Sequence, residues 1–349
     1  MSLQTTGRRL TQTQAIIEAI RQEMRRDPSV VLIGEDVAGG AGRSDKPEPE
    51  GWFAARGRGL IAEFGEQRII DTPIAEMGFV GAAVGAAMTG LRPIVDLSFI
   101  DLIGVCYDQI VNQAAKMHYM MGGQIDVPMV LRTTYGARPG ATSYGGGAGA
   151  QHSQTMYSVL AHIPGLKVVV PSGPSNAKGL LISAIRDGGP VVYLENRFLG
   201  MSARENVREE AFETEIGKAQ IARPGSDVTI ATIGRMTRVA LEAAERLVQE
   251  GIDAEVVDVL TLAPLDEDAI VESVSRTGSL VVVDEDTPTA SMARDIAARA
   301  ADKAFDYLEA PIKTVTAPES PVPFSAALEK LYVPNADAII AAVHNQRGI

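Results

Sequence analysis

The run Asp71-Thr-Pro-Ile-Ala-Glu-Met-Gly-Phe-Val-Gly-Ala-Ala-Val-Gly-Ala-Ala-Met88 is the most informative part of the chain. Within it, the carboxylate of Glu76 stands where an extended, proline-containing segment passes into a helix of small and apolar residues. Gly81 and Gly85 recur at helical spacing and would let another backbone approach closely. No residue from 77 to 90 is charged, so we expect this helix to be buried. A carboxyl group at its mouth is poorly solvated, and it then favours its neutral form or requires a specific partner.

A structural role for Glu76 is the main alternative. Acidic residues are common in the first turn of helices, because they complement the positive end of the helix dipole. On periodicity alone, the structural role is the more frequent outcome. The glycines leave a second question open, since they suit packing against another subunit as well as packing within the domain. What favours a functional role for Glu76 is the whole phrase, taken together with the rest of the chain.

Composition limits the classes of protein to be considered. The chain has 349 residues, which is enough for two domains with separate cores. Hydrophobic residues make up 46%, charged residues 22%, and the mean hydropathy is +0.06, as in compact soluble proteins. The net charge of −12 argues against nucleic acid as a partner, since binding phosphates requires a basic face.

Cysteine usage and the absence of apolar runs indicate the compartment. Cys106 is the only cysteine, so neither an intramolecular disulfide nor a thiolate zinc site can form within the chain. The N-terminus lacks the pattern of a signal peptide, and no apolar run is long enough to span a membrane. We therefore expect a cytoplasmic protein, or one from an equivalent reducing compartment, with no membrane partner.

Strand-like and helix-like stretches alternate along the first half of the chain, which is typical of a parallel sheet with helices on both faces. Helices are expected at residues 11–26, after Glu76, at Ile103–Tyr119 and at 174–186. Strands are expected at Val30–Gly34, Arg68–Ile70, Arg92–Leu97, Pro128–Arg132, Gly165–Val170 and Pro190–Leu194. Residues 198–215 are polar without periodicity and resemble a linker.

A second alternation follows the linker. Strands are expected at Asp227–Ile233, Ala254–Val259, Leu280–Val283 and Ile312–Val315, with helices at 236–250, 266–276 and 290–304. The acidic trio Asp284-Glu-Asp286 directly follows the third of these strands. The sequence therefore predicts two α/β domains, residues 1–205 and a smaller domain of residues 206–349.

Two long loops stand apart from this alternation, at residues 38–59 and 133–149, and both are rich in glycine. Loops of this length are usually functional or mobile. The second loop leads directly to His152, for which structural and functional roles are about equally supported. Its glycine run matches no phosphate-binding motif, and the histidines of the chain lack the spacing of a metal site.

The phrase Arg68-Ile-Ile-Asp-Thr-Pro-Ile-Ala-Glu-Met-Gly-Phe79 closely resembles the β subunits of the thiamine diphosphate-dependent 2-oxo acid dehydrogenases. This family includes the decarboxylating components of the pyruvate and branched-chain complexes, and acetoin dehydrogenases share almost all of the pattern. Further matching stretches, in order along nearly the whole chain, are Gly34-Glu-Asp-Val37, Gly90-Leu-Arg-Pro-Ile94, Tyr107-Asp-Gln-Ile-Val-Asn112, Gly149-Ala-Gln-His-Ser-Gln154, His162-Ile-Pro-Gly-Leu-Lys-Val-Val169, Ala177-Lys-Gly-Leu-Leu181 and Leu194-Glu-Asn196.

The resemblance implies a transketolase-like pyrimidine-binding domain followed by a transketolase C-terminal domain. It also implies an assembly of two α and two β chains around a dihydrolipoyl acyltransferase core. Enzymes of this kind hold the diphosphate through Mg²⁺ with a Gly-Asp-Gly run, which this chain lacks. We therefore expect the α subunit to supply the Mg²⁺ side of the site and this chain to supply the pyrimidine side.

By resemblance, Glu76 is the carboxylate that hydrogen-bonds N1′ of the aminopyrimidine and relays the proton exchange that activates thiazolium C2. A carboxyl group whose neutral form is favoured suits such a relay near neutral pH. His152 lies in the Gln-His-Ser motif and would assist acyl transfer to lipoamide. Ile74 and Leu102 fall where the family lines the pyrimidine pocket, although Leu102 replaces the aromatic residue of some members.

The resemblance further implies a structural potassium ion bound by backbone carbonyls. The matching positions are Met129, Ala184, Asp187 and Gly189, the last of which replaces a common asparagine.

The substrate is the least determined part of the prediction. The leading expectation is oxidative decarboxylation of a 2-oxo acid, pyruvate or a branched-chain acid, with acyl transfer to the lipoyl group. The long Thr134–Gly147 loop and the Lys46-Pro-Glu-Pro-Glu50 insert resemble acetoin-type proteins more, so acetoin cleavage is the alternative. An alternative of another class is a non-catalytic scaffold for the α chain and the acyltransferase core. Glu76 and His152 argue against this, since a scaffold needs neither.

Overall fold

A computed structural model describes residues 8–38, 57, 59–138 and 147–348. The predicted insert at 46–50 and most of the two long loops lie outside these residues. The chain divides into two compact units. Unit 1 comprises residues 1–134, 159–195 and 199–216, and unit 2 comprises residues 135–158, 196–198 and 217–349.

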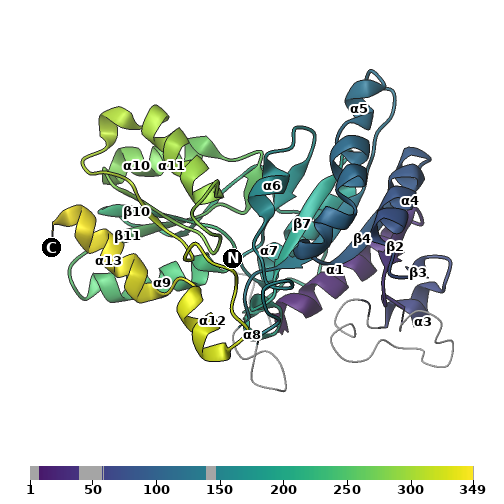
Figure 1. Cartoon of the computed structure of the whole chain (residues 1–349), viewed down its shortest axis with the longest axis horizontal. Helices are drawn as coiled ribbons and strands as arrows, with labels where there is room; N and C mark the ends of the chain where they lie inside the picture. The colour runs from purple at the N-terminus through teal and green to yellow at the C-terminus, as the bar shows by residue number, and fades with distance from the viewer. Residues whose placement is uncertain (1–7, 39–56, 58, 139–146, 349) are drawn as a thin grey trace, which may run out of the picture. The chain divides into compact units, whose positions relative to one another are not determined.

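Unit 1 is built on a twisted sheet in which the strand order is β6-β7-β5-β4-β2-β3 (Figure 1). The strand pairs β2–β3, β2–β4, β4–β5 and β6–β7 are all parallel, which confirms the predicted sheet type. The strands are β2 (Val30–Gly34), β3 (Ile69–Asp71), β4 (Arg92–Phe99), β5 (Val130–Tyr135), β6 (Lys167–Val169) and β7 (Val191–Asn196). Their residues are almost entirely buried, as expected of a sheet covered on both faces.

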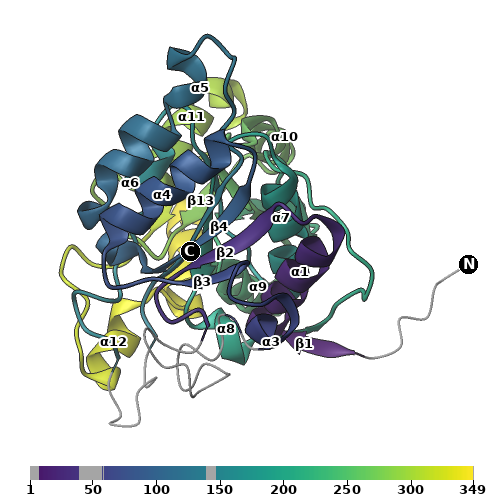
Figure 2. The same cartoon turned by 90° about the vertical axis from the view of Figure 1, so that its right-hand side faces the viewer.

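Helices cover both faces of this sheet: α1 and α7 pack together on one face, and α4 lies on the other (Figure 2). The helices are α1 (Gln12–Arg26), α3 (Leu60–Phe64), α4 (Glu76–Met88), α5 (Met117–Met120), α6 (Tyr157–Ala161), α7 (Pro174–Arg186) and α8 (Leu199–Ser202). The first of them begins as the sequence predicts. The Thr11 side chain accepts a hydrogen bond from the Gln14 N–H, and the Gln14 side chain accepts one from the Thr11 N–H, which forms a capping box.

Helix α4 is only partly buried, so the expectation of a fully buried helix is wrong for the chain by itself. Phe79, Val80 and Ala83 belong to the face that packs on the sheet. The opposite face carries Met77, which is 58% exposed, and Gly85, around which no atom of the described residues lies within 4 Å of a methyl group's position. Absence of charge therefore did not distinguish a helix buried on all sides from one with a bare apolar face.

The helix predicted over Ile103–Tyr119 is not continuous. The segment instead winds as a 3₁₀-helix, η1 (Ile100–Val105), then a π-helix, η2 (Gln109–Ala114), and then α5. A change of winding re-aims the side chains, and π-helical turns are often found at functional sites.

The segment predicted as a linker, residues 198–215, is folded into unit 1. It contains α8 and the strand β8 (Arg204–Asn206), which pairs antiparallel with β1 (Arg9–Thr11). The buried ammonium group of Lys178 donates hydrogen bonds to the backbone oxygens of Arg208 (2.7 Å) and Glu209 (2.8 Å). The polar sequence of the segment did not reveal these contacts, because they involve backbone oxygens and leave the side chains of Arg208 and Glu209 exposed.

Unit 2 contains a five-stranded sheet of order β14-β13-β10-β11-β9, parallel except for β9. Helices α9 and α13 lie on one face and α10 and α11 on the other (Figure 1). The strands of unit 2 are β9 (Gln220–Arg223), β10 (Val228–Thr232), β11 (Ala254–Asp258), β12 (Thr261–Ala263), β13 (Leu280–Val283) and β14 (Lys313–Val315). The helices are α9 (Met236–Val248), α10 (Glu267–Thr277), α11 (Met292–Lys303), η3 (Phe305–Tyr307), α12 (Ala326–Tyr332) and α13 (Ala336–Arg347).

The alternation predicted for this half is confirmed, and the sequence analysis missed α12 and α13, which follow the last predicted strand. Their apolar positions complete the core: Ile339 and Val343 of α13 pack with Val281 of β13 and Ala240 of α9.

Candidate functional site

Glu76 is the first residue of α4 and is 8% exposed. The preceding residue, Ala75, offers no side chain to cap the helix, so the carboxylate of Glu76 lies beside uncapped N–H groups and the positive end of the helix dipole. Among the residues that the structure describes, none forms a hydrogen bond or ion pair with this carboxylate. Burial of a carboxylate costs free energy unless the group is paired, so Glu76 is suited to bind a partner from outside the described residues.

The pKa of Cys106 responds to the charge of Glu76. Burial raises the pKa of the Cys106 thiol to about 12, and the negative charge of Glu76 adds to the shift. The thiol is directed to the backbone oxygen of Leu102, 3.9 Å away. A neutral thiol and the η1 turn that carries Leu102 therefore lie in the neighbourhood of Glu76.

The two predicted pocket residues differ in their environment. Ile74 lies two residues before Glu76, and its side chain is 76% exposed. Leu102 lies in η1 and is half-buried. A large exposed apolar side chain next to a buried carboxyl group is the arrangement expected where a flat, partly apolar ring binds. The role of both residues in binding a pyrimidine stays a prediction.

His152 belongs to unit 2, where it lies in the loop before α6 and is half-buried. The guanidinium Nη1 of Arg197 donates a hydrogen bond to the backbone oxygen of His152 and lies 3.5 Å from Ser153 Oγ. Arg197 and Ser153 are both buried, at 8% and 1% exposure. The loop is therefore fixed at the peptide that follows His152.

The four carbonyls predicted to bind potassium lie in unit 1, around the C-terminal end of α7. The Met129 oxygen accepts the Val191 N–H at 2.9 Å, and the Asp187 oxygen accepts Arg92 Nη1 at 2.9 Å. Ala184 lies in the last turn of α7, and the Gly189 N–H donates to Asp187 Oδ1 at 2.8 Å. The guanidinium of Arg92 thus already complements the carbonyls at this helix end.

Three acidic residues of unit 2 form a buried cluster, which the sequence analysis noted as a trio but did not predict to be buried. Asp284, Glu285 and Asp286 follow β13 and are 0%, 2% and 8% exposed. The hydroxyl of Tyr157 donates to Asp284, and the Asn196 amide donates to Glu285 at 2.8 Å. Burial raises the pKa of all three carboxyl groups, that of Asp286 to about 8. The available signal was their position directly after a buried strand, where the carboxyl ends of parallel strands meet.

A second buried group lies in the sheet of unit 1. Arg132 on β5 donates to Asp96 Oδ2 on β4 at 2.9 Å and to Glu195 Oε2 on β7 at 3.1 Å. All three residues are buried. The signal in the sequence was a charged residue within each of three apolar strands, which is rare without a partner.

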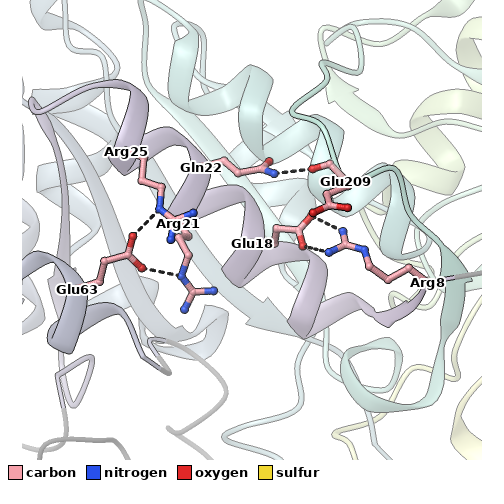
Figure 3. Close-up of a pocket in the computed structure, with 7 residues that line it drawn as sticks. All are labelled: Arg8, Glu18, Arg21, Gln22, Arg25, Glu63 and Glu209. Carbon is pink, nitrogen blue, oxygen red and sulfur yellow. Dashed lines mark hydrogen bonds and ion pairs between the residues drawn. The ribbon is translucent and has the colours of Figure 1, made fainter. Parts of the chain in front are cut away.

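A polar pocket of about 470 Å³ lies on the surface of unit 1, beside α1 (Figure 3). Five of its charged side chains form ion pairs: Glu63 pairs with Arg21 and Arg25, and Glu18 pairs with Arg8. None of the predicted site residues lines it. Exposed ion pairs of this kind are typical of a solvated protein surface and do not indicate a binding site.

A membrane-spanning helix and a cluster of metal ligands are both absent from the described residues. These residues contain no helix that is both long enough and apolar enough to cross a membrane. They also contain no cluster of three or more His, Cys, Asp or Glu side chains arranged to hold a metal ion.

Comparison with known proteins places the chain among relatives that are similar over nearly its whole length. Residues 8–201 match the transketolase pyrimidine-binding domain, and residues 217–339 match the transketolase C-terminal domain. The acetoin:2,6-dichlorophenolindophenol oxidoreductase β subunit of Bacillus subtilis is 49% identical over 96% of both chains. That of Cupriavidus necator is 50% identical over 96% of this chain and 97% of its own.

A pyruvate dehydrogenase subunit and a transketolase are also similar to the chain. The pyruvate dehydrogenase E1 component β subunit of Rhizobium meliloti is 43% identical over 96% of this chain and 69% of its own. Among solved structures, a split-gene transketolase described as an inactive β4 tetramer has a TM-score of 0.74. It covers 97% of this chain and 98% of its own at 23% identity, so that likeness concerns the fold alone.

Proposed function

The chain belongs to the family of pyruvate and acetoin dehydrogenase E1 β subunits, and from that premise we propose that it is the pyrimidine-side half of a thiamine diphosphate enzyme. It would act together with an α subunit, which would hold the diphosphate through Mg²⁺. The observation that supports this most is Glu76: a buried carboxyl group at a helix N-terminus, without a partner among the described residues.

The described residues fit an aminopyrimidine ring. Glu76 offers one carboxyl group that can share a proton with a ring nitrogen, while Ile74 and Leu102 offer apolar surface for the ring faces. When bound, the cofactor supplies a nucleophilic carbon and an electron sink for the substrate. Glu76 would hold the proton at N1′ and return it.

His152 is proposed to act in transfer to lipoamide. In that step the S–S bond of the lipoyl ring would break and be reduced by two electrons from the transferred carbon, which is oxidised to the acyl level. That carbon would bond one sulfur and lose its bond to the donor, and the other sulfur would take a proton. The imidazolium of His152 would supply this proton, because histidine exchanges protons near neutral pH. An acyltransferase core carrying the lipoyl group is therefore a proposed partner.

Two further ions are proposed with less support from the chain itself. Mg²⁺ would lie on the α side, since this sequence has no Gly-Asp-Gly run. Potassium could still bind the carbonyls around the end of α7, because a carbonyl oxygen that accepts one hydrogen bond keeps a second lone pair. Those of Met129 and Asp187 are in this state.

The substrate is proposed to be acetoin, with a 2-oxo acid as the second candidate. Identity to the two acetoin oxidoreductase β subunits is 49% and 50%, against 43% to the pyruvate dehydrogenase β subunit of Rhizobium meliloti. Loops border such sites and vary with the substrate, and the long loops of this chain resemble the acetoin-type pattern.

The test is a substrate panel on the chain assembled with its α partner. Acetoin, pyruvate and 2-oxoisovalerate are compared with lipoamide and with 2,6-dichlorophenolindophenol as acceptors. We expect turnover of acetoin with both acceptors, and none when this chain is omitted. Turnover of a 2-oxo acid but not of acetoin would make the 2-oxo acid the substrate. Equal turnover when this chain is omitted would mean that the chain is a non-catalytic scaffold.

A further inference from the structure

The loop that carries His152 is held through its backbone, within unit 2. The Gly136 N–H donates to the oxygen of Gln154 at 3.0 Å, which ties the start of the segment to its end. The His152 N–H donates to the oxygen of Gly149 at 3.3 Å. Because these contacts involve main-chain groups, the direction of the imidazole depends on how firmly the peptides on either side of His152 are held.

Arg197 is the side chain that fixes the peptide after His152. Its own N–H donates to the oxygen of Tyr135 at 3.1 Å, which anchors its backbone to the end of β5. Its guanidinium donates to the oxygen of His152 from a position that is 8% exposed. A charged donor gives a stronger bond than a neutral one, so the contact is well suited to hold a loop peptide in one orientation.

Glu329, on α12, supplies negative charge to the same region. It is 0% exposed, and Oε1 accepts the Arg138 N–H at 2.8 Å, whereas Oε2 has no hydrogen-bond partner among the described residues. Burial raises the pKa of Glu329, while the Arg138 bond and the charges of Arg197 and Arg235 oppose that shift. The bond from the Arg138 N–H thus holds this buried carboxyl group beside one flank of the loop.

The loop and α12 also touch at Gly147. Its N–H donates to the oxygen of Phe324 at 2.9 Å, just before α12 begins. A methyl group at Gly147 would overlap the Glu329 carboxylate. Glu329 therefore contacts both flanks of the segment, at Arg138 and at Gly147.

We propose that Arg197 and Glu329 are positioning residues for His152: Arg197 fixes the His152 peptide, and Glu329 holds the two flanks of the same loop, at Arg138 and at Gly147. This inference rests on the proposed role of His152 in transfer to lipoamide. A catalytic group held in one orientation avoids the entropic cost of being ordered during the reaction. Neither residue needs to touch the substrate, so their loss should affect one step selectively.

The experiment uses Arg197→Gln and Arg197→Lys in the enzyme assembled with its α partner. Turnover at saturating substrate is measured with lipoamide and with 2,6-dichlorophenolindophenol, an acceptor that needs no acyl transfer to sulfur. Arg197→Gln should lower kcat with lipoamide about tenfold or more and change dye reduction less than about twofold. Arg197→Lys should recover part of the loss, because it keeps the charge but not the planar fork.

Backbone order is measured separately by amide hydrogen exchange of residues 147–154. Exchange should be faster in Arg197→Gln and, to a smaller degree, in Glu329→Gln. Arg246→Gln is the matched control, since Arg246 lies in the same unit and pairs with the exposed Asp337 at 2.7 Å. It should change neither the acceptor ratio nor the exchange.

The outcomes separate the two proposals. If His152→Ala keeps full turnover with lipoamide, the proposed role of His152 fails, whatever Arg197 does. If His152→Ala loses that turnover but Arg197→Gln keeps both the turnover and slow exchange, the positioning role is wrong. Equal loss with both acceptors would also overturn it, since that indicates a purely structural residue. Should Arg197→Gln fail to fold, the same comparison is made on Arg197→Lys and Glu329→Gln.

Discussion

At the scale of single residues, the chain combines a buried acid that has no partner among the described residues with buried acids that are hydrogen-bonded. Glu76 is buried without a hydrogen bond among the described residues, whereas Asp284 accepts hydrogen bonds from Tyr157 and from the Ala293 N–H. Hydrogen bonds to a buried carboxyl group offset the free-energy cost of removing it from water. A buried carboxyl group that is not paired points to a group that comes from outside the chain.

Asp286 makes the stability of unit 2 depend on pH. Burial, with the charge of Asp284 beside it, raises its pKa from 3.8 to about 8. A carboxyl group whose pKa is higher in the folded state stabilises the fold fully below its ordinary pKa and loses this contribution as pH rises through the higher value. Stability should therefore fall between about pH 4 and pH 8.

The test is urea denaturation of Asp286→Asn and of the wild-type chain at several values across this range. Asn cannot ionise, so the variant should lose less stability between pH 5 and pH 8 than the wild type. Tyr157, Ser158 and Tyr332 face the same cluster and are left unchanged. Parallel pH profiles for the two proteins would show that Asp286 does not titrate as described.

The proposed site residues that the sequence analysis selected lie in short phrases. Glu76 is marked by the change from an extended segment to a small-residue helix, and His152 by the glycine-rich loop before it. Arg197 and Glu329 carry no such signal. Glu329 meets the Arg138 N–H across 191 positions, and contacts of this range follow only from the packed fold.

At the scale of elements, α4 shows what composition alone leaves undetermined. Its small, uncharged residues predicted a helix, which is confirmed, but they did not show that one face would be bare. The break of the following helix into η1, η2 and α5 was equally hidden, because all three windings use similar apolar spacing. By contrast, the predicted start of the first helix is confirmed, and the structure shows a capping box at Thr11.

The bare face of α4 allows a direct test on the unassembled chain. Glycine in an exposed helix costs conformational entropy, so Gly85→Ala should stabilise the chain by about 0.5–1 kcal/mol. Gly81→Ala is the matched control, because its methyl group would come 2.8 Å from Gln109 Oε1 and displace that side chain. Urea denaturation of both variants measures the difference. A Gly85→Ala chain no more stable than Gly81→Ala would mean that the outer face of α4 is not open.

At the scale of the whole molecule, the alternation of strands and helices was enough to predict two α/β parts. It could not give the strand order, because order depends on which buried strands meet and not on their sequence position. The segment 198–215 shows the same limit, since its polar side chains hide a backbone that pairs within unit 1.

The proposed division of the cofactor site between two chains predicts a specific binding behaviour. The purified chain should bind thiamine diphosphate weakly and without dependence on Mg²⁺, because the sequence lacks the Gly-Asp-Gly run that holds the metal and diphosphate. Addition of the α partner should produce tight binding that requires Mg²⁺. Isothermal titration calorimetry measures both cases. Tight, Mg²⁺-dependent binding by this chain alone would exclude the shared site.

We propose that Glu76 exchanges a proton with the cofactor ring. The test is the rate at which the C2 proton of bound thiamine diphosphate exchanges with deuterium. The measurement compares the wild type with Glu76→Gln, each assembled with the α partner, by quenched-flow NMR. Glu63→Gln, a change on the surface of the same unit, is the control. We predict that Glu76→Gln slows exchange by about a hundredfold or more while the cofactor stays bound. Exchange at the wild-type rate in Glu76→Gln would contradict the account.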